Sequence, residues 1–279
     1  MSLTSSGPLL GTSALLAGYD EFVDTAGEIR PAWRELAELL TERGPDGLVR
    51  LREVVRGLVD NDGITYVDVD PDGDVSEDAA LLQAWDLDGI PLLLSSSDWD
   101  ILEAAIVQRS RLLDRVLADL YGERRSITSG VLPPQLLFGH PGYIRAARGI
   151  QNPGRHQLFM LGCDVSRAPD GRFRVNADRA QAPSGVGYAL ADRRVVARAV
   201  PDVYERIGPR PASPFAQALR LALIDAAPAA AEDPVVVVLS PGIRSETAFD
   251  QAYLATVLGF PLVESADLVV RDGKLWMRS

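Results

Sequence analysis

The sequence contains one cysteine, two histidines and a single lysine among its 279 residues. One cysteine, Cys163, excludes an intrachain disulfide and a zinc site built from several thiolates. The histidines, His140 and His156, are too far apart for the paired spacing of an HExxH metal motif. Because Lys274 is the only lysine, a mechanism that needs two phosphate-binding lysines is incomplete in this chain.

Long apolar runs and an excess of positive charge are also missing. No stretch reaches the ~20 apolar residues that a membrane span requires. The formal net charge of −11 disfavours nucleic acids and anionic membranes as partners, because both would repel the chain. Residues 1–19 carry no charge and therefore lack the basic start of a signal peptide. We expect a cytoplasmic protein that binds neither a nucleic acid nor a membrane.

The first third of the chain has helical periodicity. One apolar stripe runs from Trp33 to Gly44, where the glycine ends it, and a second follows over residues 48–58. A further helix is predicted from Ser97 to Tyr121, with Ser97 as its N-cap and Gly122 as its end. Its buried face is expected to comprise Leu102, Ile106, Leu113 and Leu117.

The middle of the chain contains strand signals. Short strands are predicted at 64–69 and at 91–94. The turn Ala168-Pro169-Asp170-Gly171 predicts a hairpin between strands at 158–165 and 172–175. Residues 188–200 mix charged and β-branched residues, so helix and strand both remain open there, whereas 215–224 is predicted to be helical.

The C-terminal part has a different hydrophobic pattern. The β-branched run Val235–Leu239 is followed by a helix that ends at Gly259 and by a short strand at 261–263. This pattern predicts a strand–helix–strand unit over residues 234–264 with parallel strands. The fold class is therefore α/β, with a helical N-terminal region (1–60), a mixed β centre (61–205) and a C-terminal βαβ, Rossmann-like piece (206–279).

Two segments carry candidate chemistry, and the first is the acidic run from Asp68 to Asp78. Its alternating carboxylates resemble the start of a calcium loop, but Ala79 stands where the loop needs a bidentate glutamate. A solvated hairpin tip explains the same residues.

The second segment is Asp164–Arg194. The amides around Gly185 and Gly187 can approach a phosphate closely, and arginines such as Arg167, Arg179 and Arg193 can bind anions in fork geometry. The carboxylates that could hold magnesium are Asp164, Asp178 and Asp192. The alternative is two strands and a glycine turn with solvated charges.

The same segment resembles the circularly permuted ATP-grasp family. That family's signature runs through an acidic triplet into Pro-Ser-Gly, here Pro183-Ser184-Gly185, and then a Tyr-x-Leu-Glu-Asn-Arg stretch that begins here at Tyr188. The resemblance covers roughly residues 19–278. Its other pieces are Trp99, Gln108-Arg109, Asp119-Leu120-Tyr121-Gly122, Gly130-Val131-Leu132-Pro133, Leu239-Ser240-Pro241-Gly242, Tyr253-Leu254-Ala255 and Val263-Glu264 with Asp267-Leu268.

The wider relatives resemble glutathionylspermidine synthetase, an ATP-dependent carboxylate–amine ligase. In that chemistry ATP phosphorylates a carboxylate and an amine attacks the acyl phosphate. The resemblance implies ATP and Mg²⁺ as cofactors and a carboxylate-bearing small molecule or peptide as substrate. It implies metal binding by Asp164, Asp178 and Asp192, and nucleotide binding by Arg167, Ser184, Gly185, Gly187, Tyr188 and Arg193.

This sequence departs from the family pattern at two places, and both remove a carboxylate from the site that the resemblance implies. Ala177-Asp178-Arg179 replaces Glu-Asp-Asn, and Ala191-Asp192-Arg193 replaces Glu-Asn-Arg, so two carboxylates are lost. Family members also usually continue well past Ser279. We therefore expect a fragment or degenerate ligase that is inactive alone and is completed by the remaining C-terminal half or a second copy. The alternative is a non-catalytic module that binds a peptide or protein. We expect Cys163 to be structural, with a raised thiol pKa.

Overall fold

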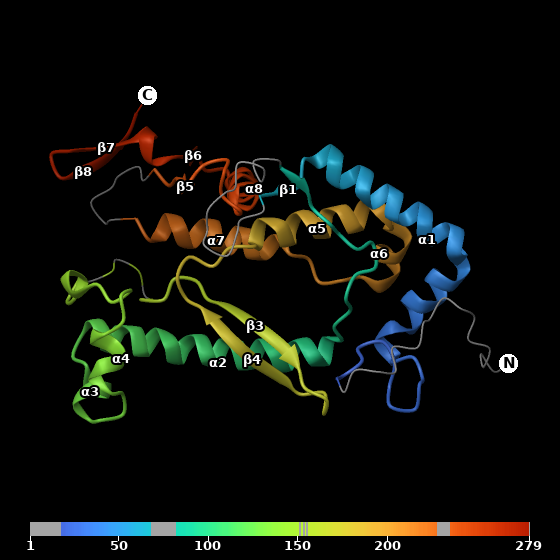
Figure 1. Cartoon of the computed structure of the whole chain (residues 1–279), viewed down its shortest axis with the longest axis horizontal. Coiled ribbons are helices and arrows are strands. Elements are labelled where there is room, and N and C mark those ends of the chain that lie inside the picture. Colours follow the sequence, from blue (N-terminus) through green and yellow to red (C-terminus); the bar gives the residue numbers. More distant parts are fainter. Residues whose placement is uncertain are drawn as a thin grey trace.

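The computed structural model describes residues 18–67, 82–150, 152, 154, 156–227 and 235–278. These residues form a mixed α/β chain in which helices predominate and the strands pair two by two (Figure 1). The acidic run at 68–78, and with it the candidate calcium loop, lies outside the described residues. The larger helices are α1 (Arg34–Asp62), α2 (Ser96–Tyr121), α5 (Val186–Ala199), α6 (Pro201–Ile207), α7 (Ser213–Asp225) and α8 (Ala248–Leu258).

The remaining elements are short. The short helices are η1 (Pro31–Trp33), α3 (Arg125–Thr128), α4 (Pro134–Phe138), η2 (Arg145–Ala147) and η3 (Ser265–Asp267). The strands are β1 (Thr65–Tyr66), β2 (Gln83–Ala84), β3 (Gly162–Arg167), β4 (Phe173–Arg179), β5 (Val238–Leu239), β6 (Leu262–Val263), β7 (Leu268–Arg271) and β8 (Lys274–Met277).

The main hydrophobic core lies between α1 and the pair α5–α6. Helix α1 bends at Gly44, whose φ of 63° interrupts the helix, and Pro45 opens the second half, as the two apolar stripes predict. The stripes of α1 face the apolar side of α5, so segments more than a hundred residues apart share one core. Its buried members are Trp33, Leu36, Leu39, Leu51, Val55, Val59, Ile64, Tyr188, Ala191, Val195, Val196, Val200 and Val203.

Helix α8 packs on α5 and belongs to the predicted strand–helix–strand unit. Strands β5 and β6 pair in parallel, with Val238 opposite Leu262 and Leu239 opposite Val263. This confirms the parallel pairing predicted for residues 234–264, although each strand is only two residues long. Residue 234 itself lies outside the described part of the chain.

Strands β3 and β4 form the predicted antiparallel hairpin, which lies along α2 (Figure 1). The tight turn between them is closed by Gly171, whose amide donates to the Ala168 carbonyl at 2.8 Å and whose φ is 82°. A register irregularity between Asp164 and Val165 leaves Asn176 of β4 without a partner in the ladder. The hairpin and α2 thus form a second layer beside the α1–α5–α8 core.

Helix α2 differs from its prediction in two ways. Its N-cap is Ser95, whose hydroxyl accepts from the Asp98 amide at 3.0 Å, and not Ser97. None of its residues is buried, so the expectation of a buried face is wrong: Leu102, Ile106, Leu113 and Leu117 are half-buried. The stripe is covered only in part, because the main core is built elsewhere.

Two further segments correct the predicted element types. Residues 91–94 are irregular and form no strand. Residues 188–200, left open between helix and strand, belong to α5 and its C-cap Val200. The centre of the chain is therefore more helical than a mixed β region.

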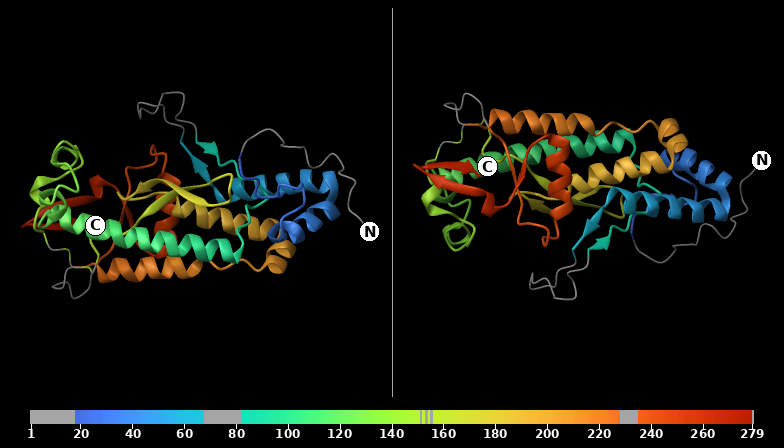
Figure 2. Two further views of the ribbon diagram at one scale, coloured as in Figure 1. Left: turned by 90° about the horizontal axis from the view of Figure 1, so that it is seen from below. Right: turned by 90° about the horizontal axis from the view of Figure 1, so that it is seen from above.

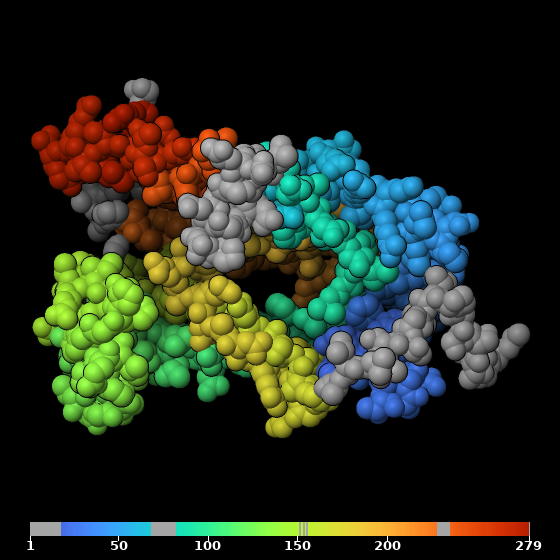
Figure 3. Space-filling view, viewed as in Figure 1, coloured from blue at the N-terminus to red at the C-terminus, as the bar shows by residue number. Residues whose placement is uncertain are grey.

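The helices α2, α5 and α7 run along the long axis of the molecule (Figure 2). In the space-filling view the surface is hollowed between the β3–β4 hairpin and the segment that follows β2 (Figure 3). Within the described residues, no helix is both long enough and apolar enough to cross a lipid bilayer.

Candidate functional site

The β3–β4 hairpin places two of the predicted metal ligands on opposite faces. Cys163 pairs with Asp178 and Asp164 pairs with Ala177 across the ladder. Because paired residues share a face and successive residues alternate, Asp178 lies on the Cys163 face and Asp164 on the other. The hairpin geometry therefore separates the two carboxylates.

Asp178 attaches the hairpin to α2 through Arg109. Arg109 Nε donates to Asp178 Oδ1 at 2.7 Å and Nη2 donates to Oδ2 at 2.6 Å, a bidentate pair. The Arg109 hydrogen bond holds the pKa of the Asp178 carboxyl below its usual range. The Cys163 thiol also points at this carboxylate, with Sγ 3.6 Å from Oδ1. Burial raises the pKa of the Cys163 thiol, in the expected direction for a structural cysteine.

Asp164, on the other face, pairs with Arg179. The Arg179 Nη2 atom lies 2.9 Å from Asp164 Oδ2, and both side chains are well exposed. Both predicted ligands on the hairpin therefore already have a cation beside them.

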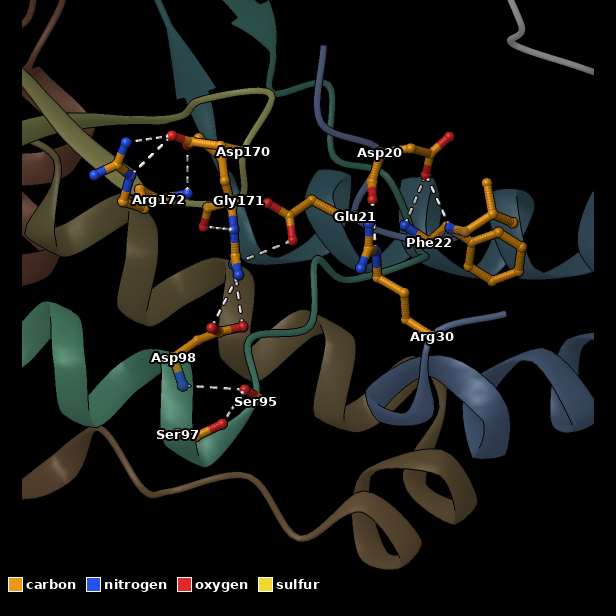
Figure 4. A network of polar contacts seen from close by, with 12 residues as sticks. Asp20, Glu21, Phe22, Arg30, Ser95, Ser97, Asp98, Asp170, Gly171 and Arg172 are labelled. Atoms are coloured by element: carbon orange, nitrogen blue, oxygen red, sulfur yellow. Dashed lines mark hydrogen bonds and ion pairs between the residues drawn. The ribbon is translucent and has the colours of Figure 1, made fainter. Parts of the chain in front are cut away.

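Arg167, predicted to clamp an anion of the substrate, is held by carboxylates of its own chain. Its Nη2 lies 2.9 Å from Asp98 Oδ1, its Nη1 lies 3.4 Å from Glu21, and its Nε donates to the Gly171 carbonyl at 2.9 Å. Figure 4 labels the three residues that accept from Arg167, namely Asp98, Glu21 and Gly171. The Tyr19 ring also lies against it. With a side chain only 10% exposed, Arg167 ties the hairpin to the start of α2.

The glycine loop lies at the N-terminus of α5 and is capped by Asp250 of α8. The amides of Gly185 and Gly187 donate to the Asp250 carboxylate at 2.9 and 2.6 Å, and the Tyr188 amide donates at 3.2 Å. Asp250 is 3% exposed, and its carboxylate occupies the position that the helix dipole offers to an anion. A Cβ at Gly187 would overlap the Asp250 carbonyl oxygen, so the glycine permits close approach of α8 rather than of a phosphate. Ser184 is exposed.

Tyr188 is part of the core. Its ring stacks on Trp85 with centroids 4.4 Å apart and contacts Phe249 at 5.1 Å. Its hydroxyl donates to the Thr65 carbonyl at 2.7 Å, and burial raises its pKa to about 12. Tyr188 therefore joins α5, α8 and the segment after α1, which leaves its ring no free face for a nucleotide base.

Asp192 and Arg193 lie one turn further along α5, at an open cavity of about 380 Å³. Arg193 Nε donates to the Tyr204 hydroxyl at 3.2 Å, and its Nη2 donates to the Arg210 carbonyl. The Asp192 Oδ1 atom is buried and, like Nε1 of the nearby Trp85 indole, makes no hydrogen bond of regular geometry among the described residues. Burial raises the pKa of the Asp192 carboxyl, and the nearby Trp85 indole offsets part of that rise.

The predicted magnesium and phosphate sites do not fit these residues. Asp164 and Asp178 face apart and each pairs with an arginine, whereas Asp192 belongs to α5. Among the described residues no group of three His, Cys, Asp or Glu side chains could hold a metal ion. The structure does not bring the three aspartates together, and their assignment as magnesium ligands stays a prediction. The loop amides expected to meet phosphate already donate to Asp250.

Sequence reasoning assigned no role to two residues that organise this region. Asp250 looks like an ordinary first-turn acid of α8, and only its burial against the glycine loop shows what it does. Arg109 lies on the same α2 face as half-buried residues, and no local pattern connects it to Asp178, 69 residues away.

Comparison with known proteins places the chain among related sequences. A family model described as a circularly permuted ATP-grasp matches residues 91–279. An uncharacterised protein of Mycobacterium tuberculosis is 69% identical over 265 residues, which cover 94% of this chain and 30% of that protein. Uncharacterised proteins of Synechocystis and Mycobacterium leprae are 31% and 32% identical, over 53% and 44% of their lengths. The chain spans 30% to 53% of the length of these relatives.

Proposed function

Because the chain belongs to the circularly permuted ATP-grasp family, we propose that it is a substructure of an ATP-dependent carboxylate–amine ligase whose active site it does not complete. The coarser activity, ATP-dependent and ligase-like, follows from family membership. Within that activity this chain supplies a folded scaffold, and the charges that act on ATP come from other residues.

The observation that carries the proposal is the internal use of the carboxylates. Phosphoryl transfer depends on positioning and on neutralising charge spread over phosphate oxygens. Asp178 is held by a bidentate arginine, and the glycine-loop amides are held by Asp250. Redirecting these groups to a substrate costs free energy, because it would leave the charged side chain that now pairs with each of them without a partner.

In the proposed activity the substrate is a small molecule or peptide with a carboxylate, and ATP and Mg²⁺ are the cofactors. The carboxylates and cations that meet them are supplied by further residues of the longer family proteins or by a second copy of this chain. This chain matches 30% of the M. tuberculosis relative and 53% of the Synechocystis relative, which supports this division, because a large part of each relative lies outside the matched part.

The test compares this chain with the full-length M. tuberculosis relative. Calorimetry measures Mg-ATP binding, and a phosphate-release assay measures turnover with and without amino acid and peptide acceptors. We expect turnover from the relative and none from the 279-residue chain. In this chain, magnesium-dependent turnover that is lost in Asp178→Asn and kept in Asp170→Asn would overturn the proposal. Asp170 is a suitable control because its partner, Arg172, lies on the same exposed turn.

A second candidate is a non-catalytic module that binds a peptide or protein. The same internal pairing favours it, since a binding module has no need of free carboxylates. If the full-length relative neither binds nor hydrolyses Mg-ATP, this second function replaces the first.

A further inference from the structure

The segment 119–150 forms a lobe at one end of the molecule, coloured light green at the lower left of Figure 3. It contains α3, α4 and η2, and we call it the α3–α4 lobe. Tyr121, at the end of α2, holds it in place: the Gly149 amide donates to the Tyr121 carbonyl at 3.0 Å, and the Ile144 amide donates to the Tyr121 hydroxyl at 3.2 Å. Residues of the lobe take no part in the glycine loop or in the β3–β4 hairpin.

The α3–α4 lobe carries positive charge in an acidic chain. It has four arginines and two acidic residues, whereas the whole chain has a net charge of −11. Both acids are already engaged: Glu123 pairs with Arg125 at 2.5 Å, and Asp119 accepts the amides of Arg125 and Ser126 at 2.7 and 3.0 Å. The remaining three arginines have no carboxylate within 4.0 Å among the described residues. They are Arg124, Arg145 and Arg148.

Two of these arginines meet at one aromatic ring. The Arg124 guanidinium lies 5.3 Å from the centroid of the Phe138 ring, and the Arg145 guanidinium lies 5.6 Å from the same centroid. Arg124 is fixed there, because its Nη2 donates to the Tyr143 hydroxyl at 2.7 Å. Its backbone φ is 59°, so this arginine is kept at a conformational cost that glycine would avoid. The lobe therefore holds two charges of one sign beside each other, and an anionic partner would relieve their repulsion.

Exposed aliphatic side chains accompany this pair of charges. Leu136 precedes Phe138 by two residues and is 66% exposed, and Ile144 directly precedes Arg145 and is 61% exposed. Ile150, at the end of the lobe, is also 61% exposed. Aliphatic groups exposed beside unpaired charges are typical of interaction surfaces. Covering both kinds of group takes a partner that carries negative charge and apolar side chains.

The charge of the rest of the chain limits what this partner can be. A nucleic acid or an anionic membrane presents an extended negative surface, which the acidic remainder of the chain would repel. A short acidic peptide can contact the lobe alone. Its carboxylates can form bidentate pairs with guanidinium groups, and its apolar side chains can cover the exposed aliphatic residues.

We propose that the α3–α4 lobe is a docking surface for an acidic peptide segment, with carboxylates on the three unpaired arginines and apolar side chains on the exposed aliphatic residues. Docking at this surface uses neither the glycine loop nor the hairpin and requires no ATP. The proposal therefore goes beyond the proposed ligase activity, and the two can fail independently of each other.

The experiment measures the fluorescence anisotropy of three labelled twelve-residue peptides with the whole chain, in the absence of ATP. One peptide repeats Glu-Leu-Glu-Gly, the second has glutamine in place of glutamate, and the third has serine in place of leucine. We expect the first to bind with a Kd below about 100 µM at low salt, the second to bind about tenfold or more weakly, and the third about threefold or more weakly. The affinity of the first peptide should fall in about 0.3 M salt, because exposed charges are screened.

Several outcomes would overturn the proposal. Equal affinity for either substituted peptide would remove the need for carboxylates or for apolar side chains. No saturable binding of the first peptide up to about 1 mM would exclude docking of this kind. Tighter binding of a twelve-nucleotide single-stranded DNA, or of phosphatidylglycerol vesicles, would replace the peptide by a nucleic acid or a lipid surface.

A double variant locates the docking surface. Arg145→Gln combined with Arg148→Gln removes two exposed charges and should weaken binding of the first peptide about tenfold. The matched control, Arg52→Gln combined with Arg56→Gln on α1, changes the net charge equally and should leave the affinity within about twofold. Equal weakening by both variants would mean that only overall charge matters and would contradict the location. If the first variant fails to fold, Ile144→Ser, which keeps every charge, should weaken binding about threefold, and unchanged binding would contradict the proposal.

Discussion

The α1–α5–α8 region and the α2–hairpin region handle charge in opposite ways. In the first, the buried Asp250 is satisfied by three backbone amides, and the surrounding residues form a core with exposures of 0–9%. In the second, α2 has no buried residue, and the hairpin is joined to it by ion pairs such as Arg109–Asp178 and Arg167–Asp98. One region is held by apolar burial and backbone capping, the other largely by side-chain charges.

This difference explains why the carboxylates of the hairpin are paired with arginines. Apolar burial stabilises by roughly 25 cal/mol per Å², whereas partly exposed ion pairs contribute little each. A hairpin lying on a half-covered helix therefore needs several such pairs to keep its place. Asp178, one of the aspartates that resemble family ligands, serves that purpose through Arg109, whereas Asp164 pairs with Arg179 within the hairpin. The following predictions test the contrast, from the largest effect to the smallest.

The largest effect is expected from removing apolar bulk in the core. Leu36 of α1 is 1% exposed, so Leu36→Ala should lower the free energy of unfolding by about 3–4 kcal/mol. Leu113→Ala in the half-buried stripe of α2 should lower it by only about 1 kcal/mol, because less surface is lost. Urea unfolding of both variants measures the two losses. Equal losses would mean that α2 is covered as completely as α1.

The second effect is the loss of the Asp250 cap. Asp250→Ala leaves the amides of Gly185, Gly187 and Tyr188 without their acceptor and should cost about 2–3 kcal/mol. Asp225→Ala, at the exposed end of α7, is the matched control and should change stability by less than about 0.5 kcal/mol. If both variants unfold at the same urea concentration as the unaltered chain, the cap does not hold α5 to α8.

The third prediction concerns alkaline pH. The pKa of Tyr188 is raised to about 12 in the folded protein, whereas an unfolded tyrosine ionises at about 10. Deprotonation therefore favours unfolding, so this contribution is complete below pH ~10 and is lost as the pH rises toward ~12. Tyr188→Phe should cost about 1 kcal/mol at pH 7, because the Thr65 carbonyl loses its donor, but should lose less stability above pH ~10.

Tyr143→Phe, on the α2 side, is the control for this experiment. It removes one tyrosine and keeps Tyr188, so it should retain the alkaline loss of the unaltered chain. Stability curves from urea unfolding at several pH values between ~8 and ~12 make the comparison. Identical curves for Tyr188→Phe and Tyr143→Phe would contradict a special role for Tyr188.

The elements that the sequence predicts well are those whose turns, apolar runs and terminating glycines lie within the element itself. The hairpin follows from the turn at 168–171, and the parallel unit follows from an apolar run, a helix and a closing glycine at 259. The sequence overestimates the burial of α2, because an apolar stripe indicates an amphipathic helix but not how much of its apolar face other elements cover. Helix α5 remained ambiguous because Val195 and Val196 favour strands, and only packing against α1 makes them helical core residues.

The candidate site was less predictable for a physical reason. Its residue types are right for a nucleotide site, but function depends on partners that are distant in sequence. Whether Asp164 and Asp178 share a face depends on hairpin register, which includes an irregularity at Asp164/Val165 that no residue pattern specifies. Arg109 and Asp250, the groups that engage Asp178 and the glycine loop, come from other helices. Tertiary contacts, and not motifs, decide which charges are free.

The smallest effect is expected at the Arg109–Asp178 pair, and it is also the most dependent on conditions. Asp178→Asn should destabilise the chain at pH 7 by less than Leu113→Ala does, because the arginine side chain is 42% exposed and water screens the pair. The Arg109 hydrogen bond lowers the pKa of Asp178 in the folded state. The stabilisation is therefore present above the unfolded value of ~3.9 and is lost as the pH falls through the folded pKa. The difference in unfolding free energy between Asp178→Asn and the unaltered chain should shrink toward zero as the pH approaches that range, and it should also shrink in about 1 M salt at neutral pH.

The loss of stability in Asp250→Ala should persist in the same salt, since it rests on buried hydrogen bonds to backbone amides. Urea unfolding of both variants in low and high salt measures the contrast. A loss in Asp178→Asn that is insensitive to both salt and pH would show that the hairpin is held to α2 by packing, and the distinction between the two regions would then fail.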